Sequence, residues 1–275
     1  MVTQQEREFA EKQLYPLFND LGLMAEAYKL SSVSAAADSN MRLDDLALKP
    51  HLMSVEVGWA ISSCFDHLVT VRNLAVKDLL PNIATHTLLR AAMEHASLAI
   101  WHLDPDEAEE RRHRVLLQGA RSASLVEKAL DIAAAKTKIS FADRLIKINK
   151  IAHQNGVKAI TAKEGRESNI KARVFAAGAL LQRQSSGSKE VNVVGALWAA
   201  TSGIAHSNTP FGLMMLNRKA LTQDHESEST TFEMEITQVE LLRLFQPSIH
   251  LLEVALQLDK YRRGADIDKY PTFSK

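Results

Sequence analysis

The sequence predicts an all-α fold, a single helical bundle with one small β-hairpin inserted near residues 211–236. Apolar side chains recur at three- and four-residue spacing through nearly every long segment, which is the pattern of amphipathic helices. The chain has 275 residues, 46% of them hydrophobic and 24% charged, and such a chain can bury a core without disulfides or a structural metal. We therefore expect one domain over 1–275, with its core at about 54–262.

The helices are expected to follow one another along the chain with short connections. The density of apolar residues in 54–78 predicts a central helix. Pro81 fits the first turn of the next helix, and Asp104 followed by Pro105 is the clearest helix start, with Asp104 as the N-cap. Residues 31–50 are expected to form a loop or a short helix. The expected helices span 4–29, 54–78, 82–103, 104–135, 139–153, 167–184, 190–206 and 238–262.

One segment changes from helical to strand spacing. Phe232, Met234 and Ile236 alternate with polar residues, which is typical of a half-buried strand. The short apolar run 211–216 is expected to be its partner strand, and the polar residues 217–229 the tip between them. We expect this hairpin to pack on the helical body.

Several functional classes are excluded or disfavoured by what the sequence lacks. The single cysteine, Cys64, excludes an internal disulfide framework and a cysteine-rich zinc site. The sequence contains no GxxxxGK[ST], GxGxxG, HExxH or GxSxG motif, so we expect no cofactor and no metal. No apolar run reaches the roughly 18–20 residues that span a bilayer, and the first residues do not resemble a signal peptide. We expect a cytoplasmic protein without a membrane partner.

Charge is unevenly distributed although the net charge of the chain is zero. Between residues 136 and 189 there are 12 Lys and Arg against 3 Asp and Glu, a local excess of +9. Such a cluster is typical of contact with a phosphate backbone, and the scarcity of aromatic residues argues against base stacking. The alternative is a solvated face that pairs with acidic segments elsewhere. The candidate nucleic-acid-binding residues are Lys147, Lys150, Lys158, Arg166, Lys171 and Arg173.

A polar stripe follows the helix expected at 82–103. Its members recur at spacings of 3 and 4, so they share one face. Arg90 and Glu94 within it are an i,i+4 pair and can meet side by side. His206 belongs to a second polar island at the end of the helix 190–206. The three tryptophans are expected to anchor the core. The stripe consists of His86, Arg90, Glu94, Ser97 and Trp101.

The segment from Arg90 to His95 contains the pattern Arg-x4-His, which resembles the signature of HEPN helical domains. Many of these are metal-independent ribonucleases of bacterial defence and toxin systems. The resemblance implies that Arg90 neutralises the scissile phosphate and that His95 transfers a proton. Glu94 and His206 would orient them. An ideal helix separates Arg90 and His95 by about 140°, so a dimer or a distorted helix would have to bring their ends together.

Two functional hypotheses follow from these observations. The first is a HEPN-like cytoplasmic protein, in bacterial defence or stress, that contacts or cleaves RNA. The second is a non-catalytic interaction protein, in which Arg90, Glu94 and His206 form a structural polar network and the helix 238–262 supports a homodimer. The expected partners are accordingly RNA, a protein partner or a second copy of the chain.

Overall fold

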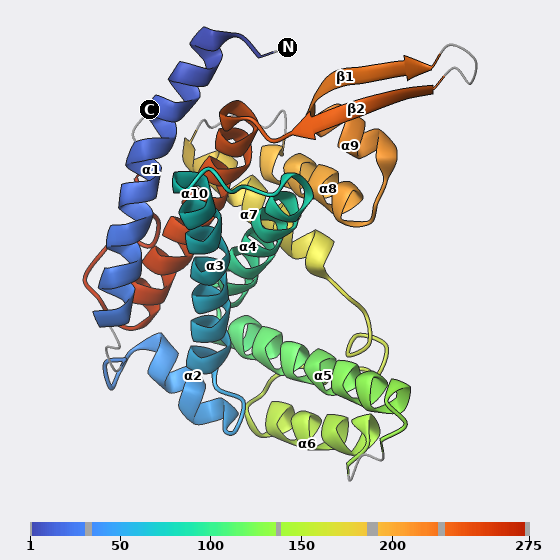
Figure 1. The fold of residues 1–275 in the computed structure, drawn as a ribbon. Coiled ribbons are helices and arrows are strands. Elements are labelled where there is room, and N and C mark those ends of the chain that lie inside the picture. Colours follow the sequence, from blue (N-terminus) through green and yellow to red (C-terminus); the bar gives the residue numbers. More distant parts are fainter. Residues whose placement is uncertain (1, 31–34, 136–138, 186–191, 225–228, 273–275) are drawn as a thin grey trace.

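A helical bundle forms the body of the protein in the computed structural model, which describes residues 2–30, 35–135, 139–185, 192–224 and 229–272 (Figure 1). The bundle agrees with the predicted fold class. The helices are α1 (Gln4–Leu30), α2 (Asn40–Leu48), α3 (Met53–Val76), α4 (Asn82–Leu103), α5 (Ala108–Ile132), α6 (Phe141–Gln154), α7 (Ile170–Ser185), α8 (Val193–Ala205), α9 (Thr209–Met215) and α10 (Gln238–Arg262). The strands are β1 (Asn217–Asp224) and β2 (Ser229–Glu235).

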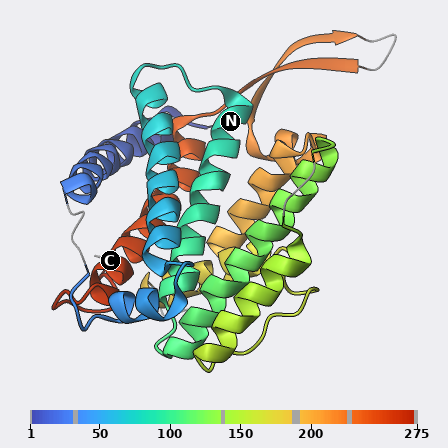
Figure 2. The same ribbon diagram turned by 90° about the horizontal axis from the view of Figure 1, so that it is seen from below.

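Helix α4 lies at the centre of the bundle and packs against α3, α7, α8 and α10. Its apolar stripe, which includes Leu89, Met93 and Ala96, is fully buried. The sequence predicts α3 as the central helix, but α3 leaves Trp59 75% exposed, so Trp59 is not the core anchor that we expected. Outside this centre, α5 and α6 lie side by side and α1 covers α10 (Figures 1 and 2).

The ends of the helices follow local capping chemistry in most cases. Ser140 caps α6 and Thr237 caps α10, each in a reciprocal capping box with the residue three positions later. The predicted start at Asp104 is wrong, because α5 begins at Ala108. Residues 104–107 form a connection instead, and tertiary contacts hold it in place.

Two buried arginines hold the connection between α4 and α5. Arg262 of α10 donates to the carbonyl oxygens of Leu103 at 2.9 Å and Pro105 at 2.8 Å, and to Asp106 Oδ1 at 2.9 Å. Arg111 of α5 donates to the carbonyl oxygen of Pro105 at 3.1 Å. The last carbonyls of a helix have no partner within the helix, so the Arg262 guanidinium group caps Leu103, the last residue of α4, while Arg111 holds the connection that follows.

The prediction of a hairpin over 211–236 packed on the helical body is wrong in position and in packing. The apolar run at its start belongs to helix α9, because Pro210 lies in the first turn of a helix there. Strand β1 is built from the polar residues that we expected at the tip, and it pairs antiparallel with β2, with Asn217 opposite Glu235. This two-stranded ribbon extends away from the helices (Figure 1).

Replacing Arg262 with alanine is expected to lower the free energy of unfolding by about 3 kcal/mol, because buried carbonyl groups at the end of α4 lose their donors. Arg243→Ala removes an exposed arginine from the same helix and is the control, with an expected loss of at most about 0.5 kcal/mol. Urea denaturation followed by circular dichroism measures both. Equal losses in the two variants would contradict a capping role for Arg262.

Candidate anion site on the polar stripe of α4

The polar stripe of α4 faces α7 and α8. Two of the predicted catalytic residues, Arg90 and Glu94, contact each other on it. Glu94 Oε1 accepts a hydrogen bond from Trp198 Nε1 of α8 at 2.8 Å and lies 3.0 Å from Arg90 Nε. The Arg90 guanidinium carbon is 5.8 Å from the centre of the Trp198 ring. The side chains of Arg90 and Glu94 are 22% and 23% exposed. The pair is therefore engaged in a local network between α4 and α8.

His95 lies on a different face of α4 and stacks on His67 of α3. The two ring centres are 5.5 Å apart and the ring planes differ by 19°. Burial lowers the pKa of His95, and the neighbouring His67 lowers it further. At neutral pH His95 is therefore mostly uncharged, and its ring packs between α3 and α4.

His206 is the C-cap of α8 and is exposed. Its neighbours Ala205 and Ser207 line a small, mainly apolar cavity of about 270 Å³ together with Ile83 at the start of α4. Ile83 and Glu94 are separated by about 16 Å along the helix axis, at 1.5 Å per residue. The structure therefore places His206 near the start of α4, well separated from Glu94.

Three arginines converge on Trp101 near the other end of the stripe. The guanidinium carbons of Arg114, Arg121 and Arg173 lie 5.3, 5.9 and 5.5 Å from the centre of its ring. We call these three residues the arginine cluster. Only Arg173 was among the predicted residues. The seven-residue spacing of Arg114 and Arg121 places both on one face of α5, but Trp101 and α7 meet that face only in the folded chain.

The arginine cluster is strongly electropositive for a partly buried site. Burial, together with the nearby Arg121, lowers the pKa of Arg173 to about 10. His102, beside Trp101, is fully buried, and burial together with the three arginines lowers its pKa to about 3. The imidazole therefore stays neutral, and the guanidinium groups carry the positive charge of the cluster.

Several buried donors of this region have no hydrogen-bond partner among the described residues. They include Nε of Arg173, Nε and Nη1 of Arg121, and Oγ of Ser97. Other donors are used: Arg114 Nε donates to Glu110 Oε1 at 2.6 Å, and Arg173 Nη1 donates to Gln118 Oε1 at 3.1 Å. Unpartnered buried donors carry a free-energy cost, and a bound acceptor would remove it.

The remaining predicted nucleic-acid-binding residues form the exposed surface of α6, of residues 155–169 and of the first turn of α7. Arg173, by contrast, is only 9% exposed and belongs to the arginine cluster. The three basic residues of the segment at 136, 138 and 189 lie outside the described residues. The exposed members are Lys147, Lys150, Lys158, Arg166 and Lys171.

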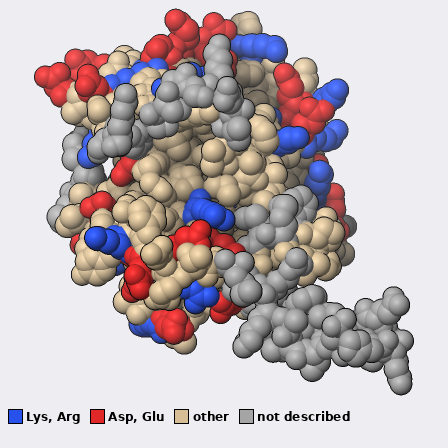
Figure 3. Space-filling model, turned by 90° about the horizontal axis from the view of Figure 1, so that it is seen from above, with Lys and Arg blue, Asp and Glu red and all other residues tan. Residues whose placement is uncertain are grey.

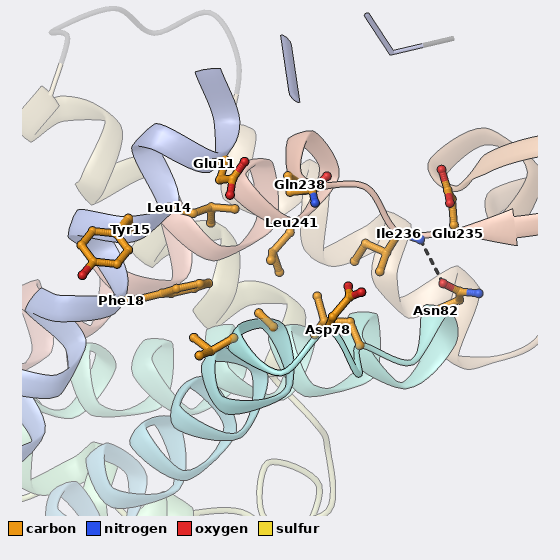
Figure 4. Close-up of a pocket in the computed structure, with 13 residues that line it drawn as sticks. Glu11, Leu14, Tyr15, Phe18, Asp78, Asn82, Glu235, Ile236, Gln238 and Leu241 are labelled. Atoms are coloured by element: carbon orange, nitrogen blue, oxygen red, sulfur yellow. Dashed lines mark hydrogen bonds between the residues drawn. The ribbon is translucent and has the colours of Figure 1, made fainter. Parts of the chain in front are cut away.

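A second cavity, of about 480 Å³, lies between α1, the connection 77–81 and the start of α10. Figure 4 shows Leu14 and Leu241 at its wall, and Ile236 donating its backbone N–H to Asn82 Oδ1 at 3.0 Å. The face seen from above in Figure 3 has an uncharged area near the middle, with basic and acidic side chains below it and around the edge. The cavity is unsuited to an anion because three carboxylates line it. They belong to Glu11, Asp78 and Glu235.

Comparisons with family models, with curated proteins and with solved structures found no match to this chain. Within the described residues, no three His, Cys, Asp or Glu side chains gather closely enough to hold a metal ion. None of the helices that the structure describes combines the length and apolar character required to cross a membrane.

The neutral state of His102 predicts how stability depends on pH. The unfolded chain takes up a proton at His102 near pH 6.5, whereas the folded chain does so only near pH 3. Stability is therefore lost as pH falls below about 6.5. His102→Phe removes this dependence, so between about pH 7 and about pH 5 its unfolding free energy should fall by about 2 kcal/mol less than that of the wild type.

Urea denaturation at each pH measures the difference between His102→Phe and the wild type. Both ring nitrogens of His102 lack a hydrogen-bond partner among the described residues, so replacing the ring by that of phenylalanine breaks no hydrogen bond there. Parallel stability curves for the two proteins over this pH range would show that His102 does not remain neutral in the folded chain.

Proposed function

We propose that this chain is a cytoplasmic protein that binds RNA through phosphate contacts at an exposed basic surface of α6, residues 155–169 and the start of α7. The surface is formed by Lys147, Lys150, Lys158, Arg166 and Lys171. The observation that carries the proposal is the exposure of these cations in a segment with few carboxylates. Lys147 and Lys150 lie three residues apart on one face of α6. Lys158 has a carboxylate nearby, with its Nζ 3.5 Å from Glu164 Oε1. The surface retains an excess of positive charge that suits a polyanion.

The choice of RNA is supported by the resemblance of the Arg90 to His95 segment to HEPN domains, many of which act on RNA. Two aromatic rings in the segment are already covered by the chain's own cations. Arg166 lies over the ring of Phe141 at 4.9 Å, and Lys171 lies over the ring of Phe175 at 5.7 Å. Contacts to phosphate groups rather than base stacking are therefore expected, with little dependence on base sequence.

Binding without cleavage is the form of this proposal that the geometry favours. Arg90 is held by Glu94 and Trp198, and His95 is stacked on His67, so each is engaged in a separate contact within the chain. In the competing hypothesis, α10 supports a homodimer. Its apolar residues Leu244, Phe245 and others are instead buried within the chain's own core, which disfavours that role.

RNA affinity should fall steeply with salt, because each neutralised phosphate releases counterions. The double variant Lys147→Gln/Lys150→Gln should bind a short single-stranded RNA about tenfold more weakly at low salt. Its slope of log affinity against log salt should be smaller by about 1.4. Fluorescence anisotropy between about 50 and about 200 mM salt measures both quantities.

The matched control is Lys12→Gln/Lys260→Gln, which removes two exposed lysines from α1 and α10 and should bind RNA as the wild type does. An RNA affinity that does not change with salt would overturn RNA binding at this surface. Equal losses of RNA affinity in the two double variants would do the same. The same RNA incubated with the wild type in EDTA should stay intact. Cleavage that His95→Ala abolishes without lowering Tm would instead establish the ribonuclease hypothesis.

A further inference from the structure

A cavity of about 150 Å³ opens beside the arginine cluster, between α4 and α7. Its cationic lining comes from Arg114, Arg173 and Arg183, and Ser97 and Trp101 of the α4 stripe complete the wall. This volume is smaller than the roughly 300–1,000 Å³ of typical ligand pockets. It therefore suits a group of a few heavy atoms rather than a whole nucleotide.

Two residues in the wall of this cavity carry hydrogen-bond donors that the described part of the protein does not use. Arg173 is 9% exposed, and with Nη1 bound to Gln118 its Nε has no partner among the described groups. Ser97 is fully buried, and its hydroxyl oxygen also has no partner in the described part of the chain. A guanidinium group and a hydroxyl group in the wall of one cavity are a donor set that matches the oxygens of a tetrahedral oxyanion.

The charges around the cavity favour an anion even when its carboxylate is counted. Asp104 also lines the cavity, but Tyr270 donates to its Oδ1 at 2.5 Å and Lys269 Nζ lies 4.0 Å from the same atom. Two further carboxylates lie close by, Glu110 at 2.6 Å from Arg114 Nε and Glu94 near Arg173. Arg121 adds a further positive charge next to Arg173. Positive charge therefore exceeds negative charge here, and a phosphate monoester carries close to two negative charges at neutral pH.

We propose that this cavity binds a phosphate group, either as inorganic phosphate or as the terminal monoester of a larger ligand, held by the side chains of Arg173 and Ser97 in its wall. Arg114 and Arg183, which also line the cavity, neutralise the negative charge of the phosphate group. The site does not depend on RNA binding at the basic surface, because the exposed cations of that surface do not line it.

Isothermal titration calorimetry of the full chain with inorganic phosphate tests the site. The wild type should show saturable binding with one site per chain. Arg173→Gln should weaken it about tenfold or more, because a charge-assisted hydrogen bond is lost. Arg183→Gln changes an exposed residue that lines the same cavity and should weaken binding as well, so the test does not depend on whether Arg173→Gln folds.

Arg166→Gln is the matched control, since it removes an exposed arginine outside the cavity and should leave phosphate affinity unchanged. It should weaken RNA binding instead, which separates failure of this site from failure of the basic surface. Absence of saturable phosphate binding to the wild type would overturn the proposal. Equal phosphate affinity in the wild type, Arg173→Gln and Arg183→Gln would do so too.

Competition identifies the source of the phosphate group. A short RNA with a 5′-phosphate should displace inorganic phosphate if the site accepts a terminal monoester, whereas the same RNA with a 5′-hydroxyl should not. If neither RNA displaces it, the ligand is free phosphate. Both results support a phosphate site. Displacement by the two RNAs with equal potency would show that the cavity responds only to the charge of the RNA backbone, and this would overturn the proposal.

Discussion

The cap that Arg262 places on the C-terminal end of α4 is the interaction on which the rest of the structure depends. A helix leaves its last carbonyl groups without partners, and Leu103, the last residue of α4, is fully buried. The guanidinium group of Arg262 comes from the far end of the chain and donates to the carbonyls of Leu103 and Pro105. The central helix is thereby tied to the last helix, and the sharp turn into α5 is held in place.

This arrangement also positions the arginine cluster. Arg111 binds the same connection and pairs with the fully buried Asp44, which holds the start of α5 against α2. Helix α5 then presents Arg114 and Arg121 to Trp101, two residues before the end of α4, while α7 presents Arg173 from the other side. The repulsion among three guanidinium groups is tolerated because the surrounding helices are held by contacts elsewhere.

Sequence patterns predicted the parts of the fold that depend on local periodicity. The long helices and the polar stripe of α4 were predicted with ends correct to within a few residues in most cases. The sequence predicts Asp104 as a helix N-cap from its neighbours alone. Arg262, which helps to hold residues 104–107 as a connection, comes from a distant position in the chain, so local spacing does not reveal its contacts. The exposure of Trp59, the helix α9 and the separation of His206 from Glu94 likewise depend on tertiary packing. The Arg90–Glu94 pair was predictable from its spacing, whereas the convergence of Arg114, Arg121 and Arg173 was not.

The central claim is that buried guanidinium and hydroxyl donors beside Trp101 are arranged for a phosphate group. Nuclear magnetic resonance of the arginine side chains tests it directly, because the Nε–H signal of Arg173 reports on the acceptor that it meets. During a titration with inorganic phosphate, this signal should shift in a saturable manner while that of the exposed Arg166 stays in place. An Arg173 signal that does not move, or that moves in parallel with that of Arg166, would contradict the account.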